Sequence, residues 1–322
     1  VTMETIHLFI VNPVAGKKDM SGDISRKAQN LGIENCFIEI TKGKSDASSL
    51  AEKWVKENPD KFIRIYACGG DGTINEVING VYKYKNCAVG GIPIGTGNDF
   101  LRTFEEFPLN DFLNLEKMTK GIEKSIDLIS CEGHIGMNEV SVGYDCAVAK
   151  NVVKFKDIPF VGGSLAYKIS LVYCLFSKMK HRFNLFADGK PMGNNGNDYL
   201  LAVFGNGKYY GGGIKGAPSA DPYDGLLDLV YIQKVSVLRF LSLVSQFIKG
   251  NHLSDKRCEP YVKNCRCKRI EIETNGFADI SVDGEIYSML NPTVEIIENA
   301  IKIILPCEKD MTNTNLFSEL KA

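Results

Sequence analysis

The run Gly69–Thr73 (Gly-Gly-Asp-Gly-Thr) combines backbone freedom with one carboxylate. It follows an apolar segment, 62–68, that is typical of a buried strand, and it precedes 74–82, which is typical of a helix. Glycines at such a turn let backbone N–H groups approach an anion, and the helix N-terminus adds positive partial charge. A carboxylate here suits Mg²⁺, which proteins hold through one or two carboxylates together with substrate phosphates. The pattern predicts a metal–polyphosphate site, and the alternative is an ordinary glycine turn in which Asp71 caps the helix.

A second glycine cluster, Gly95–Phe100, follows the apolar segment 87–94 as the first cluster follows 62–68. Two adjacent strand ends that each offer Gly, Thr and Asp favour one convergent site. Asn12–Gly16, after a third strand, would complete it. The alternative is that Thr96 or Asn98 only caps the next helix. Counter-charges for phosphate, or merely solvated side chains, could come from Lys17, Lys18 and Arg102.

Two common nucleotide motifs are absent from the chain. No Gly-Lys-Ser/Thr is present, and Gly69, Gly70 and Gly72 do not have the Gly-x-Gly-x-x-Gly spacing. The sequence therefore disfavours a P-loop enzyme and a hydride-transfer enzyme.

Carboxylates also gather at two turns later in the chain. The segment 217–228 carries Asp221, Asp224 and Asp228, and Asp283-Gly284-Glu285 follows a β-rich run. Asp-Gly is a favoured hairpin dipeptide, so the plain interpretation of both is structural. The closely spaced carboxylate and carbonyl oxygens of segment 217–228 could also hold a hard cation.

The elements that would position these residues differ between the two halves of the chain. Strands are predicted over 6–11, 36–41, 62–68 and 87–94, and helices over 22–31 and 47–55, which indicates a parallel sheet with ligands at its carboxyl edge. Beyond about Ile129, short β-rich segments alternate with turns: 137–144, 199–204, 226–232, 269–272, 279–282 and 293–297. The prediction is an N-terminal Rossmann-like parallel α/β domain and a C-terminal β-rich sandwich or barrel, with helices at 164–178 and 236–249.

Composition narrows the functional classes. The 322 residues are 44% hydrophobic with a net charge of −1, which predicts two domains and no general attraction for nucleic acid. No run reaches the ~18 apolar residues that span a bilayer, and the amino end lacks a leader pattern. Ten scattered cysteines suit a cytosolic location. A zinc cluster of His252, Cys258, Cys265 and Cys267 is disfavoured, because no Cys-x-x-Cys pair is present.

In these motifs the chain resembles the diacylglycerol kinase catalytic-domain family, which includes bacterial soluble lipid kinases and sphingosine kinases. The first glycine motif alone is shared with NAD kinases and phosphofructokinases, whereas the later elements are similar to the lipid-kinase branch. The similar pieces stand in family order over nearly the whole chain: Asn12–Gly16, Gly69–Val77, Gly95–Arg102, Ser141–Cys146, Asn206–Asp228 and Asp283–Glu285.

The resemblance implies an ATP- and Mg²⁺-dependent lipid kinase with a cleft between two domains. Residues 1–129, completed by 299–322, would bind nucleotide, and 130–298 would bind lipid. The implied ATP contacts are Asn12, Gly16, Thr41, Gly69, Gly70, Asp71, Gly72, Thr73, Asn75, Thr96 and Asp99. Asp71, Asp99 and Asp127 would organise the catalytic Mg²⁺, while Asp221, Asp224 and the carbonyl of Leu226 would hold a structural one. Glu285 would be the general base, with Asp283 nearby.

A lipid substrate requires contact with a membrane surface. The stretch 150–182 interleaves basic and apolar residues and could be an interfacial segment or plain core. The apolar helix 237–248 is expected in the core or in a dimer contact. We expect a cytoplasmic, peripherally membrane-associated protein and, from the resemblance, a homodimer. The rivals are an NAD-kinase-type enzyme with a water-soluble acceptor and a non-catalytic lipid- or nucleotide-binding protein.

Overall fold

The computed structural model describes residues 3–156, 169–170, 173–174, 176, 179–193 and 198–307. The chain forms two units, one of residues 1–127 with 298–322 and one of residues 128–297. Two long strands, β5 (Ile122–Cys131) and β16 (Thr293–Leu305), each contribute residues to both units. The predicted helix 164–178 and much of the basic stretch 150–182 lie outside the described residues.

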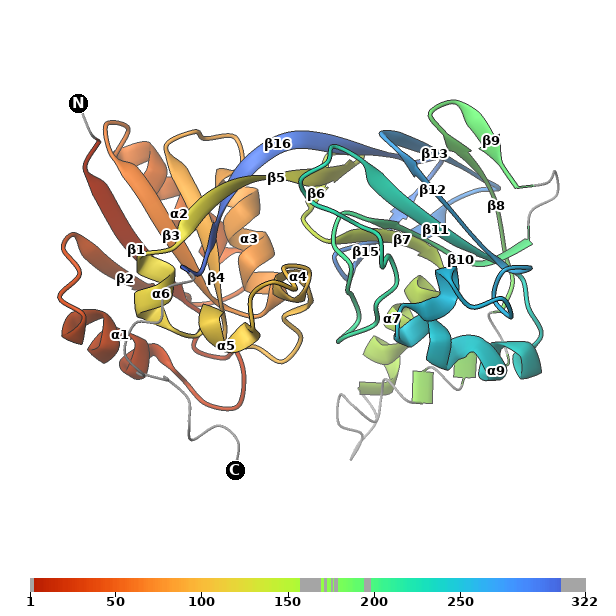
Figure 1. The fold of residues 1–322 in the computed structure, drawn as a ribbon, viewed down its shortest axis with the longest axis horizontal. Coiled ribbons are helices and arrows are strands. Elements are labelled where there is room, and N and C mark those ends of the chain that lie inside the picture. Colours follow the sequence, from red (N-terminus) through yellow and green to blue (C-terminus); the bar gives the residue numbers. More distant parts are fainter. Residues whose placement is uncertain are drawn as a thin grey trace. The chain divides into compact units, whose positions relative to one another are not determined.

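A parallel sheet forms the centre of the first unit (Figure 1). Its order is β2-β1-β3-β4, and the end of β16 pairs in parallel with β4. The bounds of these strands are β1 Thr5–Val11, β2 Cys36–Ile40, β3 Phe62–Gly69 and β4 Cys87–Pro93. The central strands are almost wholly buried, which explains their continuous apolar sequences. The predicted α/β arrangement of this half is confirmed.

Helices cover this sheet and follow the loops at the carboxyl ends of its strands. They are α1 Ser21–Asn30, α2 Asp46–Glu57, α3 Asp71–Val81, α4 Asp99–Arg102, α5 Leu109–Phe112 and α6 Leu115–Thr119. Gly32, at φ +60°, follows α1. Gly80 lets α3 pack closely on α2, because a Cβ there would lie 2.4 Å from the Ser48 carbonyl oxygen.

Antiparallel strands build the second unit. One path runs β15-β14-β7-β10-β8-β13, and β10 also pairs with β11, which pairs with β12. Their bounds are β6 His134–Gly136, β7 Glu139–Gly143, β8 His181–Ala187, β9 Lys190–Met192, β10 Asp198–Gly205, β11 Leu227–Gln233, β12 Val262–Cys267, β13 Arg269–Thr274, β14 Ala278–Val282 and β15 Glu285–Met289. The predicted β-rich second half is confirmed.

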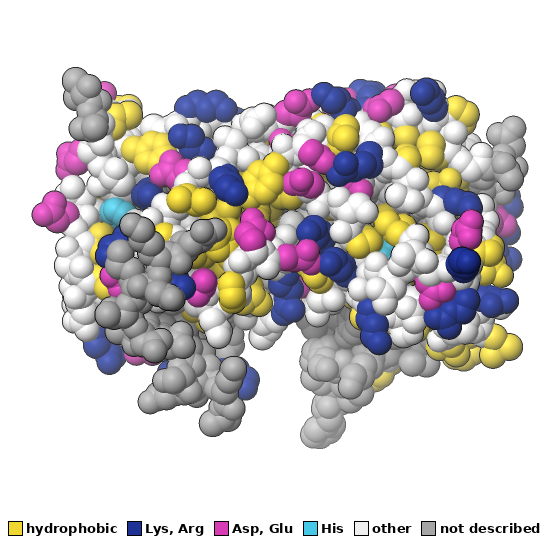
Figure 2. All heavy atoms as spheres, in the orientation of Figure 1, with side chains coloured by type: hydrophobic (Ala, Val, Ile, Leu, Met, Phe, Trp, Pro, Cys, Tyr) yellow, Lys and Arg dark blue, Asp and Glu magenta, His cyan; other side chains and the backbone are white. Residues whose placement is uncertain are grey.

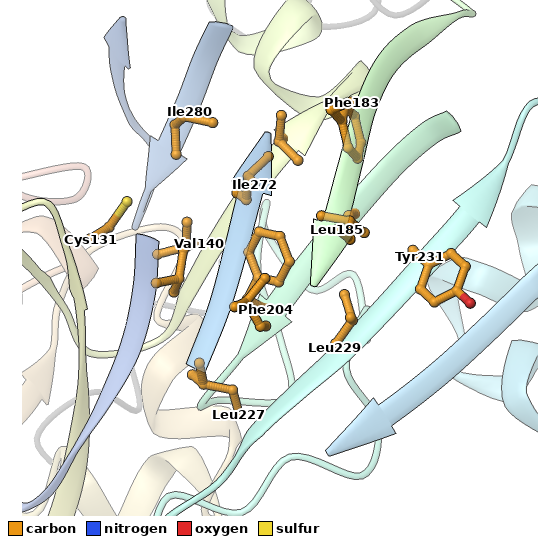
Figure 3. Packing of buried hydrophobic residues seen from close by; sticks show 14 of the residues in the cluster. Cys131, Val140, Phe183, Leu185, Phe204, Leu227, Leu229, Tyr231, Ile272 and Ile280 are labelled. Carbon is orange, nitrogen blue, oxygen red and sulfur yellow. The ribbon is translucent and has the colours of Figure 1, made fainter. Parts of the chain in front are cut away.

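Two apolar clusters lie on opposite faces of these strands. On β7, Val140 and Val142 both belong to the first cluster, in which Val140 lies near Phe204 and Ile272 (Figure 3). The alternate residues Glu139 and Ser141 lie on the other face, which follows from the two-residue period of a strand. The second cluster lies under α7 (Tyr144–Lys156) and α9 (Val237–Ile248), next to the short helix η1 (Asn251–Leu253).

Two local expectations need correction. Asp224-Gly225 is not a two-residue hairpin, because β10 and β11 are joined by the longer connection 206–226. The helix α9 forms as predicted but is not a core helix, since none of its residues is fully buried. Among the described residues, no helix has the length and apolar character needed to span a membrane.

Candidate functional site

Three loops of the first unit converge at the carboxyl ends of β1, β3 and β4. The backbone N–H of Gly95 donates to the Gly69 carbonyl oxygen at 3.1 Å. A Cβ on Gly95 would lie 2.4 Å from Gly70 Cα, and a Cβ on Gly69 would lie 2.2 Å from Thr73 Oγ1. Gly95 therefore packs directly on backbone and Gly69 on the Thr73 side chain, so space as well as flexibility requires glycine at both positions.

Asp71 joins the two glycine clusters. Its Oδ2 accepts the backbone N–H of Asp99 at 2.9 Å, and its Oδ1 accepts that of Phe100 at 3.0 Å. Asp71 is also the first residue of α3, and the N-cap, Gly70, has no side chain to offer the helix. The first N–H groups of a helix lack intrahelical acceptors, so this end of α3 can receive phosphate oxygens.

The loop after β1 completes the group. Asn12 Nδ2 donates to Thr73 Oγ1 at 3.2 Å, and the Thr41 N–H donates to the Val11 carbonyl oxygen. Gly16 has φ +78°, and a Cβ there would lie 2.2 Å from the Ile94 carbonyl oxygen. We call these three interlocked segments, Asn12–Gly16, Gly69–Thr73 and Gly95–Asp99, the glycine rim.

The remaining predicted nucleotide contacts lie on or beside the glycine rim. Gly72 and Thr96 are exposed, whereas Thr41 and Thr73 are buried. Asn75 is half-buried on the first turns of α3, where its Oδ1 accepts from Asn79 Nδ2 at 3.0 Å. The predicted ATP residues therefore come from one edge of one sheet.

The three acids predicted to organise Mg²⁺ do not form one ligand set. Asp99 is buried, and its Oδ1 lies 3.7 Å from Arg102 Nε. Asp127 is buried on β5 and accepts the Asn299 N–H at 2.7 Å. This bond holds β16 at the point where the strand enters the first unit. Within the described ranges, no group of three or more acidic, His or Cys side chains could hold a metal ion. Asp71, Asp99 and Asp127 therefore do not by themselves form a metal site, and a divalent ion here would need phosphate oxygens as further ligands.

The Asp221–Asp228 loop already contains a counter-cation. Asp224 Oδ1 accepts the Leu226 N–H, and the guanidinium of Arg266 binds Asp224 Oδ2 and Asp228 Oδ2. Asp221 accepts the N–H of Tyr223. Burial raises the pKa of Asp228, against the opposing charge of Arg266. The contacts favour Arg266 as the cation that neutralises this loop. The metal site predicted at Asp221, Asp224 and the Leu226 carbonyl remains a prediction.

In the second unit, Asp283 and Gly284 form the tight turn between β14 and β15. Their φ angles are +47° and +87°, as two-residue hairpins require. The Asp283 carboxylate accepts three backbone N–H groups, from Met137 at 2.7 Å, Asn138 at 3.0 Å and Glu139 at 2.9 Å. Asp283 is therefore a residue that positions the turn, and Glu285 is the exposed acid next to it.

Glu285 has an aromatic neighbour that the sequence analysis did not identify. The Tyr287 hydroxyl donates to Glu285 Oε2 at 2.8 Å, and the His134 ring stacks on Tyr287 with centroids 3.8 Å apart. Burial and the Glu285 carboxylate raise the pKa of Tyr287 to about 12, so the phenol keeps its proton for this bond. The two-residue spacing of Glu285 and Tyr287 on one strand could have predicted this contact, because residues i and i+2 lie on the same face.

Two buried acids, Glu139 and Asp145, were not predicted from the sequence either. Glu139 is 4% exposed, and its Oε2 has no hydrogen-bond partner among the described residues. Burial, followed by the charges of Asp283 and Asp145, raises the Glu139 pKa well above its usual value. Burial also raises the pKa of Asp145 to about 6, although the Tyr210 hydroxyl donates to it at 2.7 Å. An acid inside an apolar run was the signal.

Comparisons with known proteins match both units. Residues 7–131 match the diacylglycerol kinase catalytic domain, and residues 138–305 match the YegS C-terminal NAD kinase beta sandwich-like domain. The chain is 26% identical over 306 residues to a diacylglycerol kinase of Bacillus subtilis (strain 168), covering 94% of this chain and 96% of that protein. It is 27% identical over 307 residues to a diacylglycerol kinase of Mycobacterium tuberculosis, covering 92% and 94% respectively.

A solved structure shares the fold. A crystal structure of a diacylglycerol kinase from Bacillus anthracis superposes with a TM-score of 0.69 at 22% identity, covering 94% of this chain and 98% of the other. The two family models account for both units, and they leave few residues of either unmatched. On these matches the chain belongs to the diacylglycerol kinase catalytic-domain family of lipid kinases.

Proposed function

We propose that this protein transfers the γ-phosphate of ATP to the hydroxyl of a membrane lipid, with diacylglycerol as acceptor and phosphatidic acid as product. The observation that carries the proposal is the glycine rim, in which glycine backbone and the N-terminus of α3 face one edge of the sheet. Family membership supports the kinase class, and the names of the relatives favour diacylglycerol.

In this proposal the glycine rim binds the triphosphate, which enters as its Mg²⁺ complex. Phosphoryl transfer has a loose transition state, so positioning and charge neutralisation supply most of the rate enhancement. The metal, when bound with its nucleotide, would neutralise charge on the β- and γ-phosphates. Asp71 holds the two glycine clusters together through the Asp99 and Phe100 amides, so it fixes where the phosphates bind.

In this proposal Glu285 is the general base that accepts the proton of the lipid hydroxyl. The lipid hydroxyl oxygen forms a bond to the γ-phosphorus, the bond from that phosphorus to the bridging oxygen breaks, and ADP leaves. The hydroxyl proton passes to the Glu285 carboxylate. Glu285 suits this role because it is an exposed carboxylate whose Oε2 accepts a hydrogen bond from the Tyr287 hydroxyl, which orients it.

The proposal also covers location and partners. A diacylglycerol acceptor lies in a bilayer, so the enzyme would act at the surface of a membrane without crossing it. A cytoplasmic, peripheral location and a homodimer remain predictions.

Labelled ATP and a lipid panel in mixed micelles test the proposal. We expect label in an organic-extractable product, and Glu285→Gln should lower turnover by about 10²-fold or more with the fold intact. Glu273→Gln, an exposed acid of the same unit, is the matched control and should keep full turnover.

Other outcomes would decide against the proposal. Label in a water-soluble acceptor, with none extracted, would favour the NAD-kinase-type alternative. Binding of ATP and lipid without any transfer would indicate a non-catalytic binding protein. Full turnover in Glu285→Gln would remove Glu285 from the proton transfer.

A further inference from the structure

The helix α9 leaves an apolar stripe uncovered in the part of the chain that the structure describes. Leu238 is 81% exposed, Leu241 is 54% exposed and Ile248 is 45% exposed. Spacings of three and seven residues place them on one side of the helix. The other side packs on the second apolar cluster of the unit through Phe240, Leu243 and Phe247. The stripe is therefore not needed for the core.

Only basic residues accompany this stripe in the sequence. The segment 233–254 contains Lys234, Arg239 and Lys249 and no acid. Figure 2 shows hydrophobic side chains gathered over α9, at the lower right of the view, beside Lys and Arg side chains. Apolar side chains with basic residues around them are typical of a helix that lies in a membrane interface.

A further exposed aromatic residue closely follows, along the chain, a member of the apolar cluster on which α9 packs. Cys174 is fully buried in the apolar cluster on which α9 packs, and Phe176, two residues further along the chain, is 79% exposed. Large apolar side chains exposed close together mark interaction surfaces rather than random surface composition.

A second copy of the chain is a poor occupant for this face. A two-fold interface pairs each surface patch with itself, so the basic residues of one α9 would face a second α9 that also carries no acid. Three exposed aliphatic side chains on one 12-residue helix also fall short of the ~800 Å² that each partner buries in a stable interface. An anionic surface complements the charge instead.

We infer that α9 docks this unit on a bilayer that contains anionic lipid, with Leu238, Leu241 and Ile248 entering the interface and Arg239 and Lys249 facing the headgroups. The inference rests on the proposed function, because an enzyme whose acceptor lies in a bilayer needs such a face. It names a surface that the reaction chemistry does not use.

Vesicle flotation of the full chain, without nucleotide, tests the inference independently of kinase activity. Wild type should bind phosphatidylcholine vesicles that contain about 30% phosphatidylglycerol and bind pure phosphatidylcholine vesicles far less. The double variant Leu238→Ser/Leu241→Ser should bind the mixed vesicles roughly tenfold more weakly. Both positions are exposed, so the fold should persist.

The matched control is Ile122→Ser/Leu290→Ser, which removes two aliphatic side chains that are 46% and 52% exposed elsewhere. It should bind as wild type does. Equal vesicle binding by the α9 variant and wild type, or no binding by wild type, would overturn the inference. So would a change from dimer to monomer in the α9 variant with vesicle binding intact. If wild type binds the mixed vesicles, the α9 variant does not, and wild type has no kinase activity, then the docking surface is supported and only the proposed function fails.

Discussion

Asp71 and Asp283 perform the same structural task in different units. Each accepts backbone N–H groups on both carboxylate oxygens, two for Asp71 and three for Asp283. The loops they hold differ in composition. Asp71 joins loops of closely packed glycine backbone, whereas Asp283 supports a hairpin that carries one exposed acid, Glu285.

In the proposed function, this difference separates nucleotide binding by the glycine rim from proton transfer by Glu285. Backbone amides cannot be removed by a side-chain substitution, so the glycine rim should be damaged mainly by changes that shift or block the backbone. The hairpin depends on a single carboxylate, so one substitution there should abolish its chemistry. The following predictions test that contrast.

Asp283→Asn should have the largest effect on stability. Asn tolerates the positive φ, but it loses the charge and one acceptor oxygen that three N–H groups require. We expect a loss of about 3 kcal/mol in unfolding free energy and lower turnover with little change in ATP affinity. Chemical denaturation, nucleotide titration and turnover measure this.

Asp188→Asn is the control for Asp283→Asn. Asp188 also has φ +47° in an Asp-Gly hairpin and accepts the N–H groups of Lys268 and Arg269. It should lose stability without losing turnover. Equal losses of turnover in both variants would show that Asp283 has no special relation to the acceptor chemistry.

Asp71→Asn should weaken nucleotide binding first. Losing one acceptor for the Asp99 and Phe100 amides should destabilise the protein by about 2 kcal/mol and loosen the glycine rim. We expect ATP affinity to fall roughly tenfold, as measured by calorimetry. Asp46→Asn, at the first residue of α2, is the control, because that carboxylate also accepts a backbone N–H. Unchanged ATP affinity in Asp71→Asn would contradict the proposed binding role.

Glu139→Gln should change how stability depends on pH. The folded-state pKa of Glu139 is raised, so above its unfolded pKa the native state keeps a proton that the unfolded chain releases. The groups that shift it are Asp283 and Asp145, which raise the pKa, and the Ser141 and Ser281 hydroxyls, which lower it. Wild-type stability should therefore fall with rising pH, by at most about 1.4 kcal/mol per unit from this residue.

The Gln variant cannot titrate, so its melting temperature should gain on that of wild type between about pH 5 and pH 8. Thermal melts across this range measure the difference. A difference that stays constant with pH would mean that Glu139 does not keep its proton in the folded state.

Tyr287→Phe should have the smallest effect. It removes one hydrogen bond to an exposed carboxylate, worth about 1 kcal/mol, so turnover should fall roughly fivefold. The acidic limb of the pH–rate profile should also move up, because the phenol stabilises the ionised base. Tyr84→Phe, which removes a similar bond to Glu52 in the other unit, is the control. A wild-type profile in Tyr287→Phe would show that Tyr287 does not position Glu285.

Local pattern was sufficient for the fold class and for the loops of the glycine rim. A buried strand, a glycine turn and a helix follow one another within about a dozen residues, so their order can be predicted from neighbouring residues. The Asp-Gly hairpin at 283–284 was predicted for the same reason. At Asp224-Gly225 the same dipeptide stands inside a longer connection, because pairing of β10 with β11 is decided by strands and not by the turn.

Residue types and their order along the chain, read from the sequence alone, predicted the family, a two-part organisation and the segments that could bind phosphate. The tertiary structure decided which atoms satisfy each carboxylate, that Glu139 is buried, and which side of α9 faces water. These depend on partners far away in the chain, such as Asp71 with Asp99 and Asp283 with Met137, 28 and 146 residues apart. Side-chain periodicity marks faces, whereas burial and hydrogen-bond partners arise only when distant segments pack together.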